Sequence, residues 1–354
     1  MIAPRIPDEH SEARLTEIRR QAQEKGLVQA PGVRLTGAPF PQATAQEGYY
    51  GIPLLKQPQW KWEVPIYFFV GGAAGASAII GAMANWTGAD RRLARDARWL
   101  AAGGGALSAA LLTADLGVPR RFLNMLRVFK LQSPMSVGAW MMTLFTSASA
   151  AAAFAGLMRD RVGDSRPVRL LENGSEIFSA LTGLGMSSYT GVLIGATAIP
   201  VWNENIDTLP LHFAASGLGA AVSLLELAGH DTAALNLLGI GSALAESLEG
   251  LKLESQNHEV NRPLRRGASG WITRAGGALS GPAPLVLRLL AAVSRGERAR
   301  DLRRQAAIMT VAGSLLTRVG WLRAGHASAR DYRLPLEIES APKLSPKSDR
   351  AIST

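Results

Sequence analysis

The sequence contains no cysteine, and this absence excludes several kinds of chemistry. Without thiols, the chain cannot form disulfides, use a thiolate nucleophile or hold an iron–sulfur cluster by itself. Histidine is also scarce: His212 and His230 stand at opposite ends of one expected helix, and the other three lie in expected tails or loops. A bis-imidazole haem needs histidines at matched depth on facing helices, so we expect neither haem nor metal in this chain. If the protein handles electrons, another subunit must carry the redox centre.

Charge is the second shortage. Only 19% of residues are charged while 47% are hydrophobic, and the charges gather between apolar runs of about 20 residues, the length that crosses a bilayer. The sequence therefore predicts an all-α polytopic membrane protein, a bundle of about eight transmembrane helices with both termini on the same side. Glu246 and Glu249 interrupt the sixth span, while Pro282, Pro284 and Arg288 crowd the seventh. The eight expected spans are 65–86, 99–117, 137–157, 177–201, 209–229, 232–251, 279–294 and 304–322.

The spans predict three parts: a polar N-terminal tail over 1–59, a transmembrane domain over 60–325 and a polar C-terminal tail over 326–354. Within the first tail, 8–26 has the composition of a short surface helix, and a stretch rich in proline and glycine follows it. The tail is either disordered or a docking arm for a partner subunit. No cleavable signal peptide is recognisable, so we expect the first span to direct insertion.

Basic residues in the connections set the expected topology. The net charge of +10 comes mostly from arginines between the spans, which indicates contact with lipid headgroups, and we expect no nucleic-acid binding. Arginine is more frequent in 91–98, 159–169 and 295–304 than in the loops of the other face. By the positive-inside rule these loops are cytoplasmic. The tails and the 118–136 loop then lie on the periplasmic side of a bacterial inner membrane.

Glycine, alanine and serine are abundant inside the spans, as in GGAAGASAIIGA and AAGGGALSAA. Small residues let helix backbones approach closely within lipid. These glycines are not a nucleotide-binding fingerprint, because no strand, turn and helix surround them.

Ionisable and aromatic residues collect at one end of the expected bundle. Ionisable groups at membrane depth are costly and usually face a bundle interior or a water-filled cavity, so this set predicts a polar pocket. With the polar residues beside them, the set comprises Glu63, Tyr67, Asp115, Gln132, Ser133, Trp140, His212, Glu246, Glu249 and Arg318.

Each of these residues also has a plainer interpretation. Asp115 could pair with Arg120 or Arg121, and Glu63 could be an ordinary carboxylate at headgroup level. Trp140 and the other tryptophans near span ends fit an aromatic belt. Tyr189 differs, because a phenol near the middle of the fourth span needs a buried partner or a ligand.

A pocket of buried acids and a tyrosine without a redox centre suits quinone chemistry. A quinol loses two protons as it loses two electrons, so its pocket needs proton acceptors and hydrogen-bond donors. A secondary transporter with buried acids and interrupted helices is an alternative interpretation. A membrane anchor that tethers a redox enzyme without binding quinone is another.

Several motifs, in order along residues 60–330, resemble the NrfD family, which includes the membrane subunits of polysulfide reductase and of alternative complex III. They are WKWEVPIYFFVGGAAG, DLGVPRRF, SPMSVGAW, YTGVLIGATAIPVW and LPLHFAASG. The resemblance implies a membrane subunit that exchanges electrons between a quinone, either menaquinone or ubiquinone, and a four-cluster ferredoxin-like iron–sulfur subunit. It also implies that a molybdopterin oxidoreductase or a multihaem cytochrome can stand beyond that partner.

The resemblance also implies roles for particular residues. Asp115 and Glu63 match acids that take up or release protons, and Tyr189 matches the family's SYxG tyrosine as a quinone hydrogen-bond donor. Tyr67 stands where some members have a quinone-contacting histidine. Arg121 and Ser133 lie on the loop expected to face the iron–sulfur subunit. The expected cofactor-binding set is Tyr67, Tyr189, Trp140, His212, Ser133 and Arg121.

Overall fold

The computed structural model describes most of the chain from residue 58 onward. The described residues are 58–88, 90–116, 122–255 and 258–331, with Glu17, Arg20, Gln21, Glu24 and Leu55. The chain divides into two units, Met1–Pro53 and Leu54–Thr354. Every regular element among the described residues of the second unit is helical, which confirms the all-α prediction. Most of the expected N-terminal tail lies outside the described residues.

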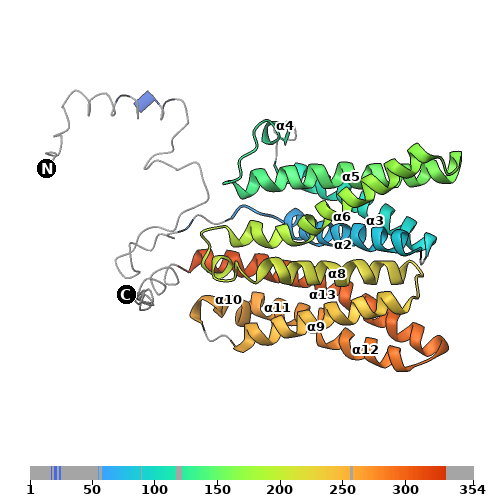
Figure 1. The fold of residues 1–354 in the computed structure, drawn as a ribbon. Coiled ribbons are helices and arrows are strands. Elements are labelled where there is room, and N and C mark those ends of the chain that lie inside the picture. The colour runs from blue at the N-terminus through green and yellow to red at the C-terminus, as the bar shows by residue number, and fades with distance from the viewer. Residues whose placement is uncertain are drawn as a thin grey trace, which may run out of the picture. The chain divides into compact units, whose positions relative to one another are not determined.

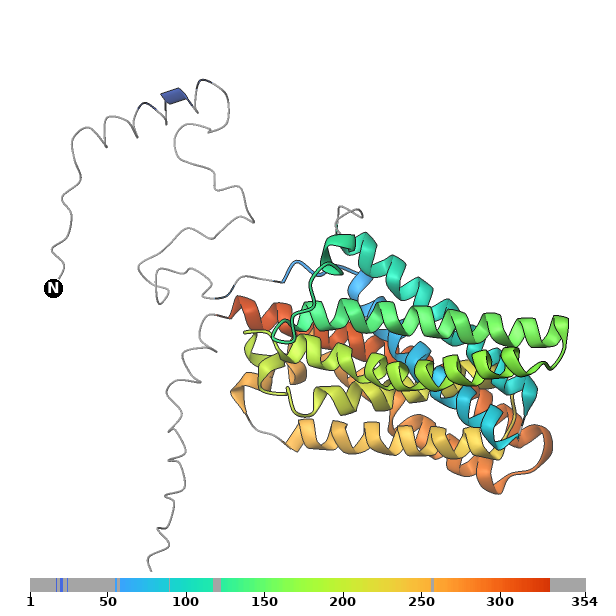
Figure 2. The ribbon, with the colours of Figure 1, turned by 45° about the horizontal axis from the view of Figure 1, so that its top comes forward.

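The long helices form two groups packed side by side (Figures 1 and 2). The first group contains α2 (Glu63–Thr87), α3 (Arg91–Asp115), α5 (Pro134–Val162) and α6 (Arg166–Gly195). The second contains α8 (Leu209–Leu227), α9 (Ala233–Ser255), α11 (Gly267–Ser280), α12 (Pro282–Val293) and α13 (Gly296–Arg330). Short elements connect them: α4 (Phe122–Met125), α7 (Pro200–Asn203), η3 (Glu259–Asn261) and α10 (Arg262–Arg265). The groups meet where α2 and α6 pack against α8, and α2 against α13.

Five helices among the described residues are long and apolar enough to cross a membrane. They are α2, α5, α6, α8 and the pair α11–α12, taken together as Gly267–Val293. The chain is therefore an integral membrane protein. The expected number of eight is not confirmed, because α3, α9 and α13 are long but do not combine that length with a sufficiently apolar stretch.

The observed boundaries differ from the expected ones where proline and glycine intervene. The fourth span was expected to reach residue 201, but α6 ends at Gly195 and Pro200 begins the short helix α7. The seventh span is expected at 279–294, but the helical segment begins earlier, at Gly267, and is divided into α11 and α12 at Gly281, whose φ −104° and ψ −101° lie outside the helical region. Pro282 and Pro284 follow, and proline suits the first turn of a new helix because it has no N–H to donate.

Two glycine contacts bring the backbone of α2 against its neighbours. A Cβ at Gly75 would overlap the carbonyl oxygen of Gly183 in α6, and the reverse is also true. Similarly, a Cβ at Gly217 in α8 would stand 2.9 Å from the carbonyl oxygen of Gly72. Helices in lipid gain most of their packing energy at such close approaches. α2 therefore occupies the centre of the unit, in contact with α3, α6, α8 and α13.

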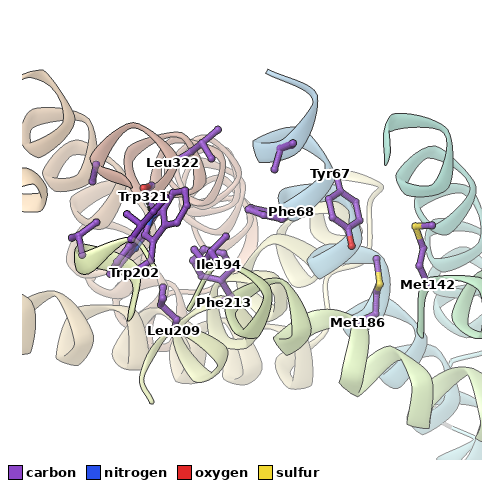
Figure 3. Close-up of a cluster of buried hydrophobic side chains, with 14 of the residues drawn as sticks. Tyr67, Phe68, Met142, Met186, Ile194, Trp202, Leu209, Phe213, Trp321 and Leu322 are labelled. Atoms are coloured by element: carbon purple, nitrogen blue, oxygen red, sulfur yellow. Dashed lines mark hydrogen bonds between the residues drawn. The ribbon is translucent and has the colours of Figure 1, made fainter. Parts of the chain in front are cut away.

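A cluster of large apolar side chains fills the space between the groups (Figure 3). Trp202 and Trp321 lie together at one side, Phe68 lies near the middle, and Tyr67 lies toward Met186. The indole Nε1 of Trp202 donates to the carbonyl oxygen of Trp321 at 2.8 Å. The ring of Trp202 stacks on Trp60 with centroids 5.3 Å apart, so Trp60 belongs to the core although it begins an expected aromatic belt.

Buried ion pairs hold the end of the bundle where α2 finishes and α3 begins. The guanidinium of Arg98 lies 2.8 Å from Glu172 and 2.7 Å from Glu176, and Arg159 reaches Glu172 at 2.9 Å. The sequence places Arg98 in a loop, but α3 begins at Arg91, so Arg98 stands inside the helix with its side chain 11% exposed.

The Gly75–Gly183 contact predicts that added volume at Gly75 destabilises the fold. We expect Gly75→Leu to lower the free energy of unfolding by about 1–3 kcal/mol or more, because overpacking forces the backbones apart. Gly103→Leu in α3 is the matched control, since a Cβ there meets no atom within 4 Å. Thermal unfolding of both variants in detergent measures the difference. Equal losses of stability in the two variants would contradict the contact.

Candidate functional site

Two carboxylates from different helices meet at the end of the bundle where α2 begins. Glu63 is the first residue of α2 and Asp115 the last of α3, so antiparallel packing places them at one level. Their charges are close enough to repel each other. The Oε2 atom of Glu63 is buried and has no hydrogen-bond partner in the described part of the chain. The acids that the sequence singled out therefore lie together.

Two tyrosines lie deeper in the same helices. Tyr67 follows Glu63 by four residues, roughly 6 Å along the helix, and is 2% exposed. Because α2 and α6 run antiparallel and cross at Gly75 and Gly183, Tyr67 and Tyr189 come to the same level. The two phenols are close enough for a charge on one to affect the other. We call Glu63, Tyr67, Asp115 and Tyr189 the tyrosine cluster.

Tyr189 is buried without a partner for its hydroxyl. It is 7% exposed, and its Oη atom lies against the backbone of Gly138 without meeting the geometry of a full hydrogen bond to any described residue. The ring lies directly on Gly138 of α5, where a Cβ would overlap the phenol. Gly138 is thus a residue of the site that sequence reasoning missed, although it stands inside the SPMSVGAW motif. A glycine has no functional group, and the sequence does not show which residue of another helix packs against it.

Two buried hydroxyls in the first group of helices also lack partners. The Oγ atom of Ser108 in α3 and the Oγ1 atom of Thr146 in α5 make no hydrogen bond within the described residues. A Cβ at Gly71 would stand 3.4 Å from the Ser108 hydroxyl and 3.6 Å from the Tyr67 ring. Ser108 therefore lies beside Tyr67, and it was missed because serine in such a helix usually bonds to its own backbone.

The start of α5 holds two further candidates with different surroundings. Ser133 is the N-cap residue, and its hydroxyl accepts from the backbone N–H of Ser136 at 3.4 Å. Trp140 follows Gly138 by two residues, so it points roughly 200° away around the helix and does not face Tyr189. Its ring contacts Phe129 edge-on at 6.1 Å, and its Nε1 atom is buried without a described partner. Arg121, with its expected docking role, lies outside the described residues.

His212 belongs to a second polar cluster. Its Nδ1 atom lies 3.6 Å from Oε1 of Glu246 in α9, and its ring lies 6.1 Å from that of Trp321. Successive ring contacts connect His212 to Tyr67 through Phe213 and Phe68, at 5.8, 6.0 and 5.5 Å between centroids. Two aromatic rings therefore stand between His212 and the tyrosine cluster.

Arg318, in α13, adds a buried cation to this second cluster. Its guanidinium is fully buried, donates to the Ser216 hydroxyl at 2.5 Å and to the Phe213 carbonyl at 2.9 Å, and lies 4.5 Å from the centroid of the Phe213 ring. It also attracts the Glu246 carboxylate. We call His212, Glu246 and Arg318 the histidine cluster. No group of three or more possible metal ligands occurs among the described residues.

Comparison with known families identifies the family of the chain. The family model described as "Polysulphide reductase, NrfD" matches residues 54–233, just over half of the chain. The chain belongs to the NrfD family. The match runs from the segment before α2 to the start of α9, so it contains the whole tyrosine cluster. NrfD proteins are membrane subunits of polysulfide reductase-like complexes. No curated protein was found to match the chain.

The contact between Tyr189 and Gly138 can be tested without any ligand. In the wild-type background, we expect Gly138→Ala to destabilise the protein by about 1–3 kcal/mol through overpacking against the phenol. In a Tyr189→Ala background the same change should cost little, because the ring that it strikes is gone. A double-mutant cycle of unfolding free energies measures this coupling. Gly174→Ala in α6, where a Cβ meets no atom within 4 Å, is the control, and equal costs of Gly138→Ala in both backgrounds would contradict the contact.

Proposed function

We propose that this NrfD-family chain is the quinone-binding membrane subunit of a multi-subunit oxidoreductase. The observation that carries the proposal is the tyrosine cluster, where Glu63 and Tyr189 from two helices each bring a buried polar atom with no described partner. Leaving such an atom unpaired costs about 1–3 kcal/mol. A molecule with oxygen atoms at both ends of a ring would satisfy these atoms.

The chemistry of the cluster suits transfer of protons to and from such a ring. Oxidation of a quinol to a quinone releases two protons and two electrons. The phenols of Tyr67 and Tyr189 can donate hydrogen bonds to ring oxygens, and the adjoining carboxylates of Asp115 and Glu63 can take the two protons. Reduction is the reverse, with the carboxylic acids as proton donors.

The electrons require another protein, because this chain has no cysteine for an iron–sulfur cluster. We propose a four-cluster ferredoxin-like partner, with a molybdopterin oxidoreductase or a multihaem cytochrome beyond it. The connection between α3 and α5 supports docking at this end of the bundle. It leaves large apolar side chains in the open, and such patches mark protein interfaces. They are Leu123, Val128, Phe129, Leu131 and Met135, each more than half exposed.

The proposed setting is a bacterial inner membrane, with this connection and both tails on the periplasmic side. The arginines that favour this orientation lie at the opposite end. Arg91, Arg92 and Arg95 are exposed on the first turns of α3, where they can contact lipid headgroups. We also propose the N-terminal tail, residues 1–59, as a contact for the partner.

Removing the Tyr189 hydroxyl should weaken a quinone-site ligand. We expect Tyr189→Phe to raise the Kd of 2-heptyl-4-hydroxyquinoline N-oxide at its tyrosine-cluster site about fivefold to tenfold, the cost of one lost hydrogen bond. Fluorescence quenching of this quinol analogue on the purified complex measures binding. Ser188→Ala is the control, since that hydroxyl donates to the backbone of Leu184 at 3.0 Å. Unchanged affinity in Tyr189→Phe would favour a membrane anchor that binds no quinone at this position.

Neutralising Asp115 should slow turnover while leaving the complex assembled. We expect Asp115→Asn to lower quinol-linked kcat at least about tenfold, because a positioned proton acceptor contributes about 10²–10⁴-fold and Glu63 can take over part of that role. Asp160→Asn, an exposed change at the far end of α5, is the matched control. Normal kcat in assembled Asp115→Asn complex would remove the proton role from this residue.

A further inference from the structure

A cavity of about 320 Å³ lies among α8, α9, α11 and α13, in the second group of helices. The proposed function does not use it, since the tyrosine cluster lies in the first group. Ligand pockets are concave, mostly apolar and contain a few convergent polar groups. This cavity has that composition: Leu253, Leu264 and Trp321 supply apolar wall, while His212 and Glu246 stand on its lining.

Glu246 is a buried acid, and one of its two carboxylate oxygens has no hydrogen-bond partner among the described residues. The residue is 2% exposed, and its Oε2 atom accepts from the Ser280 hydroxyl at 2.8 Å. Its Oε1 atom has no hydrogen-bond partner among the described residues, and the same holds for Nδ1 of His212, 3.6 Å away. That separation is too long for a good hydrogen bond. An acceptor and an imidazole nitrogen thus stand side by side on the cavity lining, each open to a further partner.

The surrounding charges favour a neutral ligand over a cation. Arg318 attracts the Glu246 carboxylate and so balances its charge. Two nitrogens of the guanidinium are held by the Ser216 hydroxyl and the Phe213 carbonyl, and the group lies on the Phe213 ring, while its Nε atom has no hydrogen-bond partner among the described residues. A neutral hydroxyl can donate to Glu246 without changing this balance, whereas an added cation would leave a net positive charge in an apolar interior.

The cavity reaches the outer surface of the bundle between α9 and α11. Ala278 and Pro282 line it and are exposed, and they belong to the α11–α12 pair that is apolar enough to cross the membrane. Lipid therefore adjoins this opening. Nearer the end of the bundle, Arg274 of α11 donates to Glu254 of α9 at 2.6 and 2.8 Å and joins the two helices across the lining. A ligand would enter from the bilayer.

We propose that this cavity is a second binding site, for a neutral amphiphile with a hydroxylated ring, of the quinol class. The ring hydroxyl donates to Oε1 of Glu246, His212 bonds a second ring oxygen, and the ring packs against Trp321. The alkyl tail leaves beside Ala278 toward the lipid. The choice of quinol as the ligand rests on the proposed function, whereas the site itself rests on the geometry of the cavity and its two unpartnered polar atoms.

Two variants remove the site in different ways. Gly277 lines the cavity and a Cβ there meets no atom within 4 Å, so Gly277→Leu fills the cavity without striking the backbone. Glu246→Gln keeps the size of the side chain and an acceptor for Ser280, but turns a donor toward the cavity. Gly241→Leu in α9, also with open space around its Cβ, lies off the cavity lining and is the control.

The test counts binding sites on the purified intact complex with 2-heptyl-4-hydroxyquinoline N-oxide, by fluorescence quenching. We expect two sites per chain in the wild type and in Gly241→Leu. Gly277→Leu should retain one site, and Glu246→Gln should weaken one site at least tenfold. Tyr189→Phe should weaken the other. Native mass spectrometry of the same samples reports any phospholipid that the wild type retains and Gly277→Leu loses.

The outcomes separate this inference from the proposed function. If neither cavity variant changes the number or affinity of sites, the second site is refuted, and the tyrosine cluster is judged by Tyr189→Phe alone. If Gly277→Leu loses a phospholipid but no analogue site, the quinol assignment of the cavity is overturned. If the cavity variants abolish all binding and Tyr189→Phe changes nothing, the cavity is supported as the ligand site and the role of the tyrosine cluster fails.

Discussion

The close approach of α2 to α6 and α8 is the constraint on which the rest of the structure depends. At Gly75 and Gly183 the backbones touch, so α2 can lie in the centre of the unit. That position brings Tyr67 level with Tyr189 on one side and lets Phe68 reach Phe213 on the other, at 6.0 Å. A larger residue at the crossing would separate the helices that supply the tyrosine cluster. The small-residue composition of the spans is therefore a requirement of the site as well as of packing.

Buried polar groups are treated differently at the two ends of the bundle. At the end where α3 begins, each buried carboxylate faces a guanidinium: Glu172 and Glu176 face Arg98, and Glu226 bonds Arg288 in two places at 2.8 Å. Removing one partner of such a pair is costly, so these groups fix helix positions. At the other end, Glu63 and Glu246 have no guanidinium within salt-bridge distance in the described part of the chain, and each keeps an oxygen atom without a hydrogen bond. The same cost of burial holds there, and a ligand would offset it.

The sequence allowed the fold class, most helices and the tyrosine cluster's members to be predicted, because alternating helix directions determine which end of the bundle a residue occupies. Glu63 begins one span and Asp115 ends the next, and successive spans run in opposite directions. The positions of the two residues in the sequence therefore predict that they lie at the same end of the bundle. Residue positions alone do not show how each helix is rotated about its axis or which helices pack against it. His212 has the right depth for the tyrosine cluster but faces Glu246, and Trp140 turns away from Tyr189 by its position two residues after Gly138. Arg98 looked like a loop residue because its partners, Glu172 and Glu176, stand more than seventy positions later in the chain.

The aromatic core decides how the two polar clusters relate to each other. Phe68 and Phe213 stand between Tyr67 and His212, so no polar side chain bridges the clusters along that line of ring contacts. A proton released at Asp115 is therefore close to Glu63 and to the end of the bundle. Along the line of ring contacts, the apolar rings of Phe68 and Phe213 separate it from Glu246. Arg318 stabilises this separation, because its guanidinium lies on the Phe213 ring and holds Ser216 and the Phe213 carbonyl from the side of the histidine cluster. The clusters can consequently bind ligands independently, although α2, which carries two members of the tyrosine cluster, packs against α8 and α13, which carry two members of the histidine cluster.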